Sequence, residues 1–131
     1  MMAMNKLKQE IIEAAVGGIE EPQMDTIKQR YRFGRDFIGF AGHFPGNPIL
    51  PAFVQILLGM TVAEKHKGCR LEVASVEKAK FLIPLLPEKE IEVECRQRSM
   101  DEPWSYDVRL LVSEGLAASY RISFSAREDG K

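Results

Sequence analysis

Residues 42–52 read GHFPGNPILPA, and the apolar run FVQILLGMTVA follows at 53–63. Three prolines and two glycines exclude regular structure before Pro51, because each proline fixes its own φ and keeps its predecessor out of the helical region. Pro51 itself suits the first turn of a helix. We therefore expect a rigid loop carrying His43 that leads into a helix N-terminus, where unpaired N–H groups favour an anion. A base beside such a helix end suits chemistry next to a carbonyl group.

The helix predicted from Pro51 to about His66 is apolar on nearly every side over its first three turns. A helix with this character is buried. In a small protein with many strands, one buried helix implies a sheet that wraps around it. We therefore predict an α+β fold in which one long central helix is wrapped by an antiparallel β-sheet.

Five segments alternate apolar and polar residues with a period of two, which predicts half-buried strands. They are 27–33, 71–75, 91–96, 106–112 and 120–125, with a hairpin turn at 113–115. Long antiparallel strands of this kind are typical of a sheet with one dry face and one wet face.

The length of 131 residues predicts a single domain over 1–131. Near the N-terminus apolar residues recur at helical spacing, so we expect an amphipathic helix over 1–18 that ends at Gly17 and Gly18. A connector is expected at 20–22, and residues 127–131 form a polar tail.

Composition argues against several classes of function. Eighteen basic and nineteen acidic residues leave a net charge of −1, so there is no basic excess for nucleic acid. The longest apolar stretch, 49–63, is shorter than the roughly 20 residues of a membrane span, and no signal peptide is evident. Cys69 and Cys95 are too few for a disulfide framework, so we expect reduced thiols in a cytoplasmic protein. The two histidines and two cysteines lack ligand spacing, so neither a metal nor a cofactor is expected.

The loop resembles the signature of the hotdog-fold 3-hydroxyacyl-ACP dehydratases FabZ and FabA, which reads roughly H-F-x-G-x-P-x-x-P-G, then four residues, then an acid. The loop spans Gly42 to Pro51 and includes Pro45, and five of its residues match in register: His43, Phe44, Gly46, Pro48 and Pro51. The segment 76–87 is similar to the family's strand around Lys-Ala-Arg-Phe with two prolines after it, although Glu88 replaces a following glycine. The resemblance covers about 27–126 and implies a hotdog fold. The strand that the family usually places before this region is not evident.

The resemblance implies roles for individual residues. His43 would be the base that removes a proton from the α-carbon, and the backbone N–H of Ala52, which replaces the last glycine of the motif, would hold the thioester carbonyl. In the family a Glu or Asp from the other subunit protonates the departing hydroxyl. That position is Leu57, which cannot transfer a proton.

Other side chains are poor substitutes for the missing acid. Gln55 lies about 200° around the helix from Leu57 and is expected to point elsewhere. Glu64 shares a face with Leu57 but lies roughly 10 Å along the helix, whereas direct proton transfer needs about 3 Å. Asp36, on the approach to the loop, is a further candidate.

Three functional interpretations therefore stay open. The first is a FabZ/FabA-like dehydratase of fatty-acid or related acyl-chain biosynthesis. The second is a protein that only binds acyl-ACP or acyl-CoA, or half of a heterodimer whose partner supplies the acid. The third is a hotdog thioesterase. The resemblance implies an acyl thioester on acyl carrier protein or CoA as the ligand, and a homodimer or a higher oligomer built from dimers.

Two clusters have alternative interpretations. Arg30, Arg32 and Arg35 either face an acidic carrier protein or form an ordinary solvated strand face, and Phe37, Ile38 and Phe40 either line an acyl tunnel or belong to the core.

Overall fold

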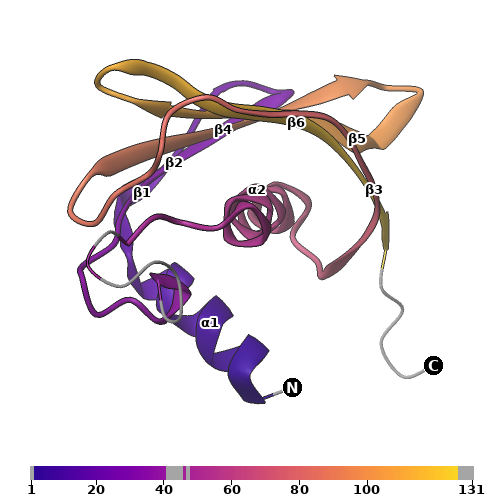
Figure 1. The fold of residues 1–131 in the computed structure, drawn as a ribbon. Coiled ribbons are helices and arrows are strands. Elements are labelled where there is room, and N and C mark those ends of the chain that lie inside the picture. Colours follow the sequence, from indigo (N-terminus) through magenta and orange to yellow (C-terminus); the bar gives the residue numbers. More distant parts are fainter. Residues whose placement is uncertain (1, 41–45, 47, 127–131) are drawn as a thin grey trace.

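The computed structural model of the protein describes residues 2–40, 46 and 48–126 (Figure 1). The elements run in the order α1 (Met2–Glu13), β1 (Ala15–Gln23), β2 (Thr26–Arg32), a 3₁₀ turn (Ile38–Phe40), α2 (Ala52–Lys67), β3 (Leu71–Phe81), β4 (Glu90–Ser99), β5 (Glu102–Val112) and β6 (Gly115–Ala126). The strands form one antiparallel six-stranded sheet in the order β1-β2-β4-β5-β6-β3.

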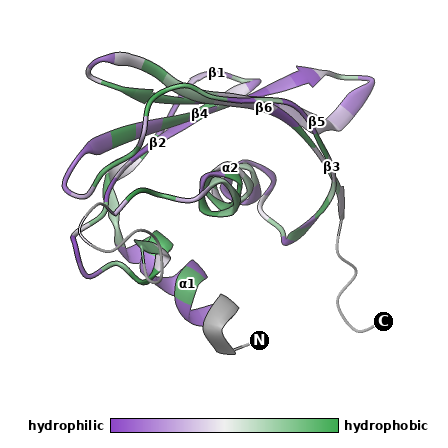
Figure 2. Cartoon of the chain, viewed as in Figure 1, coloured by the Kyte–Doolittle hydropathy of each residue, from purple (hydrophilic) through white to green (hydrophobic). Residues whose placement is uncertain are grey.

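The sheet curves around α2, and α1 lies on the same concave side (Figure 1). Hydrophobic and hydrophilic residues both occur along the strands (Figure 2), and in β2, β4 and β5 buried and exposed positions tend to alternate. Two bulges interrupt β3 opposite β6. Bulges bend a strand and increase its twist, which helps a sheet to curve. The predicted α+β hotdog arrangement is confirmed.

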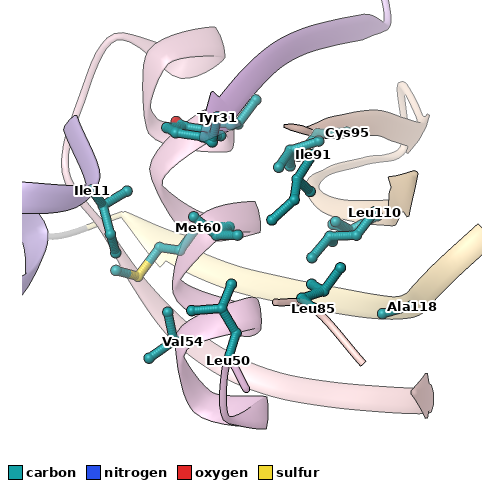
Figure 3. Close-up of a cluster of buried hydrophobic side chains, with 14 of the residues drawn as sticks. Ile11, Tyr31, Leu50, Val54, Met60, Leu85, Ile91, Cys95, Leu110 and Ala118 are labelled. Carbon is teal, nitrogen blue, oxygen red and sulfur yellow. The ribbon is translucent and has the colours of Figure 1, made fainter. Parts of the chain in front are cut away.

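The core lies between α2 and the four central strands, as the close-up of buried side chains illustrates (Figure 3). The helix approaches the sheet most closely at Gly59, where an added Cβ would lie 2.3 Å from the Tyr120 hydroxyl oxygen. That hydroxyl donates to the carbonyl of Gln55 at 2.7 Å and accepts from the amide of Gly59 at 3.2 Å. In a regular helix these two backbone groups are hydrogen-bonded to each other as an i, i+4 pair. The Tyr120 hydroxyl therefore links strand β6 directly to the backbone of α2.

The N-terminal region differs from the prediction. The helix ends at Glu13, and the glycines and the supposed connector at 20–22 all belong to strand β1. Gly17 has φ +72° at an irregular step in the pairing of β1 with β2. This edge strand is almost fully exposed, so its sequence has no apolar alternation, and that is why no strand was predicted here.

The other edge strand also corrects an expectation. The alternation at 71–75 predicted one dry face, but in β3 only Leu71 is buried, while Val73 and Phe81 are about two-fifths exposed. The remaining predicted strands are confirmed, and a hairpin turn joins β5 to β6 at Ser113 and Glu114.

The central helix is confirmed with small changes at its ends. Pro51 is the residue before the first turn, with φ −69° and ψ 159°, rather than part of it. His66, near the C-terminal end of the helix, is half-buried, with Nδ1 2.6 Å from the Tyr106 hydroxyl and Nε2 3.1 Å from the carbonyl of Met24. Within the described ranges, neither helix has the length and apolar character needed to cross a bilayer.

Candidate functional site at the N-terminus of the central helix

A surface pocket of about 380 Å³ lies at the N-terminal end of α2. Two segments line it, the entry to the helix with its first turn and the loop that follows β3: Ile49, Leu50, Pro51, Ala52, Gln55, Phe81, Leu82, Ile83 and Pro84. None of these side chains ionises. The pocket is therefore an apolar site next to the positive end of a helix dipole.

Backbone hydrogen bonds hold the two segments together. The amide of Leu50 donates to the carbonyl of Leu85 at 2.9 Å, and the amides of Leu82 and Ile83 donate to the carbonyl of Ala117 at 2.7 and 3.1 Å. These are the two stretches that resemble the dehydratase signature, and they lie about 30 residues apart in the sequence. The fold brings them to opposite sides of one pocket.

The first turn of α2 has two backbone donors without a partner among the described residues, and one of them belongs to Ala52 in the pocket lining. No side chain caps the helix at Pro51. The amides of Val54 and Gln55 donate to the carbonyl of Pro51 at 3.1 and 3.2 Å, which leaves those of Ala52 and Phe53 without a backbone partner among the described residues. The side chains of both residues are exposed. Such a pair of N–H groups suits a carbonyl oxygen that gains negative charge.

Gln55 is the polar side chain of the pocket, and the sequence analysis missed it. Its side chain is only 5 % exposed, and Nε2 donates to the carbonyl of Leu50 at 3.0 Å. Its Oε1 has no hydrogen-bond donor within the described part of the chain. Helical geometry correctly directs Gln55 away from Leu57, but it cannot indicate that the 81–84 loop lies on that side of the helix.

Half of the predicted loop lies outside the described residues, namely Gly42, His43, Phe44, Pro45 and Asn47. Gly46 has φ +82°, a conformation that favours glycine, and Pro48 is half-buried. The placement of His43 therefore remains a prediction from the sequence.

The predicted substitutes for the missing acid are occupied elsewhere or exposed. Leu57 is half-buried against the core. Glu64 is bonded through Oε1 to Lys8 at 3.4 Å and through Oε2 to the amide of Leu71 at 3.0 Å. Asp36 is exposed beside a different surface pocket, together with Arg32, Arg35 and three glutamates. No carboxylate of the described chain lines the pocket at the helix N-terminus.

The structure describes the apolar cluster at 37–40 and the arginine cluster at 30–35, which had alternative interpretations. Phe37 and Phe40 are buried in the core, with Ile38 packed against it, so these residues are not the wall of this pocket. Arg30 pairs with Glu90 at 3.4 Å on the exposed sheet face.

Among the described residues, neither the two cysteines nor the potential metal ligands form a second candidate functional site. Burial raises the pKa of the Cys95 thiol, which lies 3.4 Å from the carbonyl of Gly59, whereas Cys69 is exposed. In the ranges that the structure describes, no three potential metal ligands gather in one place.

The sequence of the chain is similar to those of known dehydratases. The sequence model of the ApeI-like family, described as ApeI dehydratase, matches residues 19–120. The 3-hydroxyacyl-[acyl-carrier-protein] dehydratase FabZ of Fusobacterium nucleatum is 36% identical over 73 residues, which are 52% of this chain and 50% of that protein. The match thus spans half the length of this curated relative.

Solved structures agree on the fold. A chain of the dehydratase heterocomplex ApeI:P from Xenorhabdus doucetiae superposes with a TM-score of 0.74 at 22% identity, over 86% of this chain and 96% of that one. The PaaI protein from the phenylacetic acid degradation operon of E. coli superposes with a TM-score of 0.63 at 14% identity, over 96% and 92% of the two chains. At sequence identities of 22% and 14%, the structural similarity shows a shared fold and nothing further.

Proposed function

The chain belongs to the ApeI-like dehydratase family, and from this premise we propose that it dehydrates 3-hydroxyacyl thioesters, with His43 as the base. The observation that carries the proposal is the apolar pocket at the N-terminus of α2. There Ala52, whose amide has no backbone partner among the described residues, lines the same pocket as residues 81–84. A pocket with backbone donors at one end and apolar walls suits an acyl chain that carries one polarised carbonyl group.

The proposed reaction removes a proton from C2 and the hydroxyl group from C3 of the acyl chain. The thioester carbonyl accepts a hydrogen bond from the Ala52 amide, which stabilises negative charge as it develops on the oxygen. His43 takes a proton from C2, the electron pair of that C–H bond forms the C2–C3 double bond, and the C3–O bond breaks. The hydroxyl leaves as water after it accepts a proton from an acid.

We propose that a partner chain supplies the acid, because none of the described residues that line the pocket is ionisable. By resemblance, the family acid reaches the site from the other subunit. A homodimer would offer Leu57 at both sites, whereas a heterodimer with a Glu- or Asp-bearing partner would complete the site that holds this chain's His43. The description of the Xenorhabdus relative as a dehydratase heterocomplex supports this arrangement.

The substrate is proposed to arrive as a thioester of acyl carrier protein or CoA during fatty-acid or related acyl-chain synthesis. The name of the Fusobacterium relative supports a carrier-bound substrate. The exposed edge strand β3 supports association into dimers, because unpaired strand edges readily pair with a second chain. A cytoplasmic location, predicted from the unpaired cysteines, is part of the same proposal.

A spectroscopic assay with a crotonyl thioester tests the proposed function. We expect Leu57→Glu to restore the acid within a homodimer and to raise the rate of hydration by about 10²–10⁴-fold over wild type. His43→Ala should abolish turnover in both backgrounds. Ile56→Glu, which adds a carboxylate to a neighbouring half-buried position on α2, is the matched control and should give no gain.

The outcomes separate the alternatives. Unchanged turnover in His43→Ala would rule out the histidine base. Release of free thiol without change at the double bond would indicate a thioesterase. Binding of the thioester without turnover in any variant would leave a protein that only binds acyl groups.

A further inference from the structure

We propose that Gln55 is a specificity-determining residue of this pocket, and that its Oε1 accepts a hydrogen bond from the 3-hydroxyl group of the acyl chain. The inference rests on the proposed function, because it assumes that an acyl thioester occupies the pocket. It assigns a role to a side chain that matches no residue of the family's catalytic pair.

One hydrogen bond and burial hold the Gln55 carboxamide in place, and a second hydrogen bond holds its backbone. Its Nε2 donates to the carbonyl of Leu50 at 3.0 Å, which determines the orientation of the amide group, since an oxygen in that position would face another oxygen. Its own backbone carbonyl accepts from the Tyr120 hydroxyl at 2.7 Å. The side chain is 95% buried, as its exposed fraction of 5% implies. It is therefore preorganised before any ligand arrives.

The fixed orientation leaves one strong acceptor unused. Oε1 is buried and has no donor among the described residues. Buried polar atoms without a partner are rare in folded proteins, and those that occur call for an explanation such as a ligand. Gln55 is also one of the residues that line the pocket, so the inference assigns the missing donor to a ligand bound there.

The chemistry of the pocket selects the kind of donor. Oε1 is a neutral amide oxygen within apolar walls, and no acidic side chain of the described lining would favour a cationic ligand. A neutral O–H group therefore suits it better than an ammonium group, which would lose its hydration without a counter-charge.

The spacing along the helix matches the substrate. Gln55 lies three residues after Ala52, and residues so spaced are neighbours on a helix surface, about 5–6 Å apart between Cβ atoms. In a 3-hydroxyacyl thioester a single methylene group separates the carbonyl carbon from the carbon that bears the hydroxyl. A carbonyl oxygen at the Ala52 amide thus brings the hydroxyl toward Gln55. The saturated acyl group and the 2-enoyl product lack this hydroxyl and lose the contact.

Equilibrium binding of matched ligands tests the inference. The affinities of 3-hydroxybutyryl and butyryl pantetheine thioesters are compared by calorimetry in the His43→Ala background, where the hydroxyacyl ligand is not consumed. We expect the hydroxyacyl ligand to bind about 10-fold more tightly, as one neutral hydrogen bond at a buried acceptor permits. Gln55→Met, of similar length but without the acceptor, should bind both ligands equally. Leu82→Met is the matched control in the opposite wall and should preserve the 10-fold preference.

A second measurement uses the unaltered side chain, in case Gln55→Met does not fold. The ¹³C shift of the Gln55 side-chain carbonyl should respond to the hydroxyacyl ligand and not to the butyryl ligand. Equal affinities for the two ligands together with equal carbonyl shifts would overturn the role of Gln55 while leaving the proposed function intact. Failure to bind either ligand would overturn both.

Discussion

The two ends of α2 differ in how many of their polar groups are already paired. At the C-terminal end Gly68 adopts φ +70° and donates to the carbonyl of Glu64 at 2.8 Å. The basic side chains of the last turn each have a partner: Lys65 with Gln29, His66 with Tyr106, and Lys67 with Gln97. At the N-terminal end no side chain caps the helix, and Gln55 keeps an unused acceptor within the described structure.

We infer from this difference that the C-terminal end of α2 contributes to stability and that the N-terminal end contributes to ligand binding. Paired groups at the C-terminal end hold the helix to β2, β4 and β5. Donors and acceptors that have no partner among the described residues of the N-terminal end reduce stability unless a ligand satisfies them, which is consistent with the proposed binding site. The comparison predicts that changes at the open end alter ligand chemistry, whereas changes at the closed end alter only stability.

The largest effect is expected from Ala52→Pro at the open end. Proline is well tolerated at the first helical position, and the ψ of 159° at Pro51 is already compatible with a following proline. The change therefore removes the N–H that is proposed to hold the carbonyl without breaking the helix, and turnover of the crotonyl thioester in the Leu57→Glu background should fall by about 10²-fold.

Two controls sharpen this result. Ala52→Gly keeps the N–H and should keep the turnover, and His66→Ala at the closed end should also leave it unchanged while lowering the unfolding free energy by about 1 kcal/mol. Equal turnover in Ala52→Pro and Ala52→Gly would show that this amide holds no substrate.

A smaller effect is expected between the two ends, where α2 touches the sheet. Gly59→Ala places a Cβ against the Tyr120 hydroxyl and against Val108, 3.1 Å from its Cγ1. Overpacking of this kind should lower the unfolding free energy by about 1–3 kcal/mol in urea denaturation, despite the better helix propensity of alanine. The double variant Gly59→Ala/Tyr120→Phe should recover part of the loss. A stable Gly59→Ala protein would contradict the close approach of helix and sheet.

The smallest expected effect is on the pH dependence of stability. It concerns Tyr120, which bonds to the N-terminal half of α2, and Tyr106, which bonds to the C-terminal half. Burial raises the pKa of Tyr120 and also that of Tyr106. The folded state then keeps protons that the unfolded chain releases above about pH 10, so stability is full below that pH and falls as the pH rises beyond it. Each such tyrosine contributes a slope of about 1.4 kcal/mol per pH unit.

Urea denaturation between pH 9 and 11 measures these slopes. Tyr120→Phe and Tyr106→Phe should each make the decline with pH less steep, since each removes one buried phenol. Parallel pH profiles for wild type and both variants would show that neither phenol resists ionisation.

Elements with a strong apolar pattern could be predicted from the sequence, and elements without one could not. The helix at 52–67 follows from its continuous apolar run after Pro51, and the strands β2, β4, β5 and β6 follow from their period of two. Strand β1 was missed because an exposed edge carries no alternation, and β3 was assigned a dry face that it lacks.

The candidate site was only partly predictable for a related reason. The loop motif and the prolines after β3 each indicated the same family, but only the tertiary fold brings residues 49–52 and 81–84 to one pocket. Gln55 was missed because a helical wheel gives its direction relative to Leu57 and not the segment it faces. Its buried, unused acceptor is visible only once the neighbouring chain is in place.

The most direct test of the open N-terminal end is a titration of ¹⁵N-labelled protein with 3-hydroxybutyryl pantetheine thioester. The account predicts saturable shifts at the amides of Ala52, Phe53, Leu82 and Ile83, with those of 66–68 unmoved. Shifts at 66–68, or no saturable shift at 52–53, would contradict a binding site at this end of the helix.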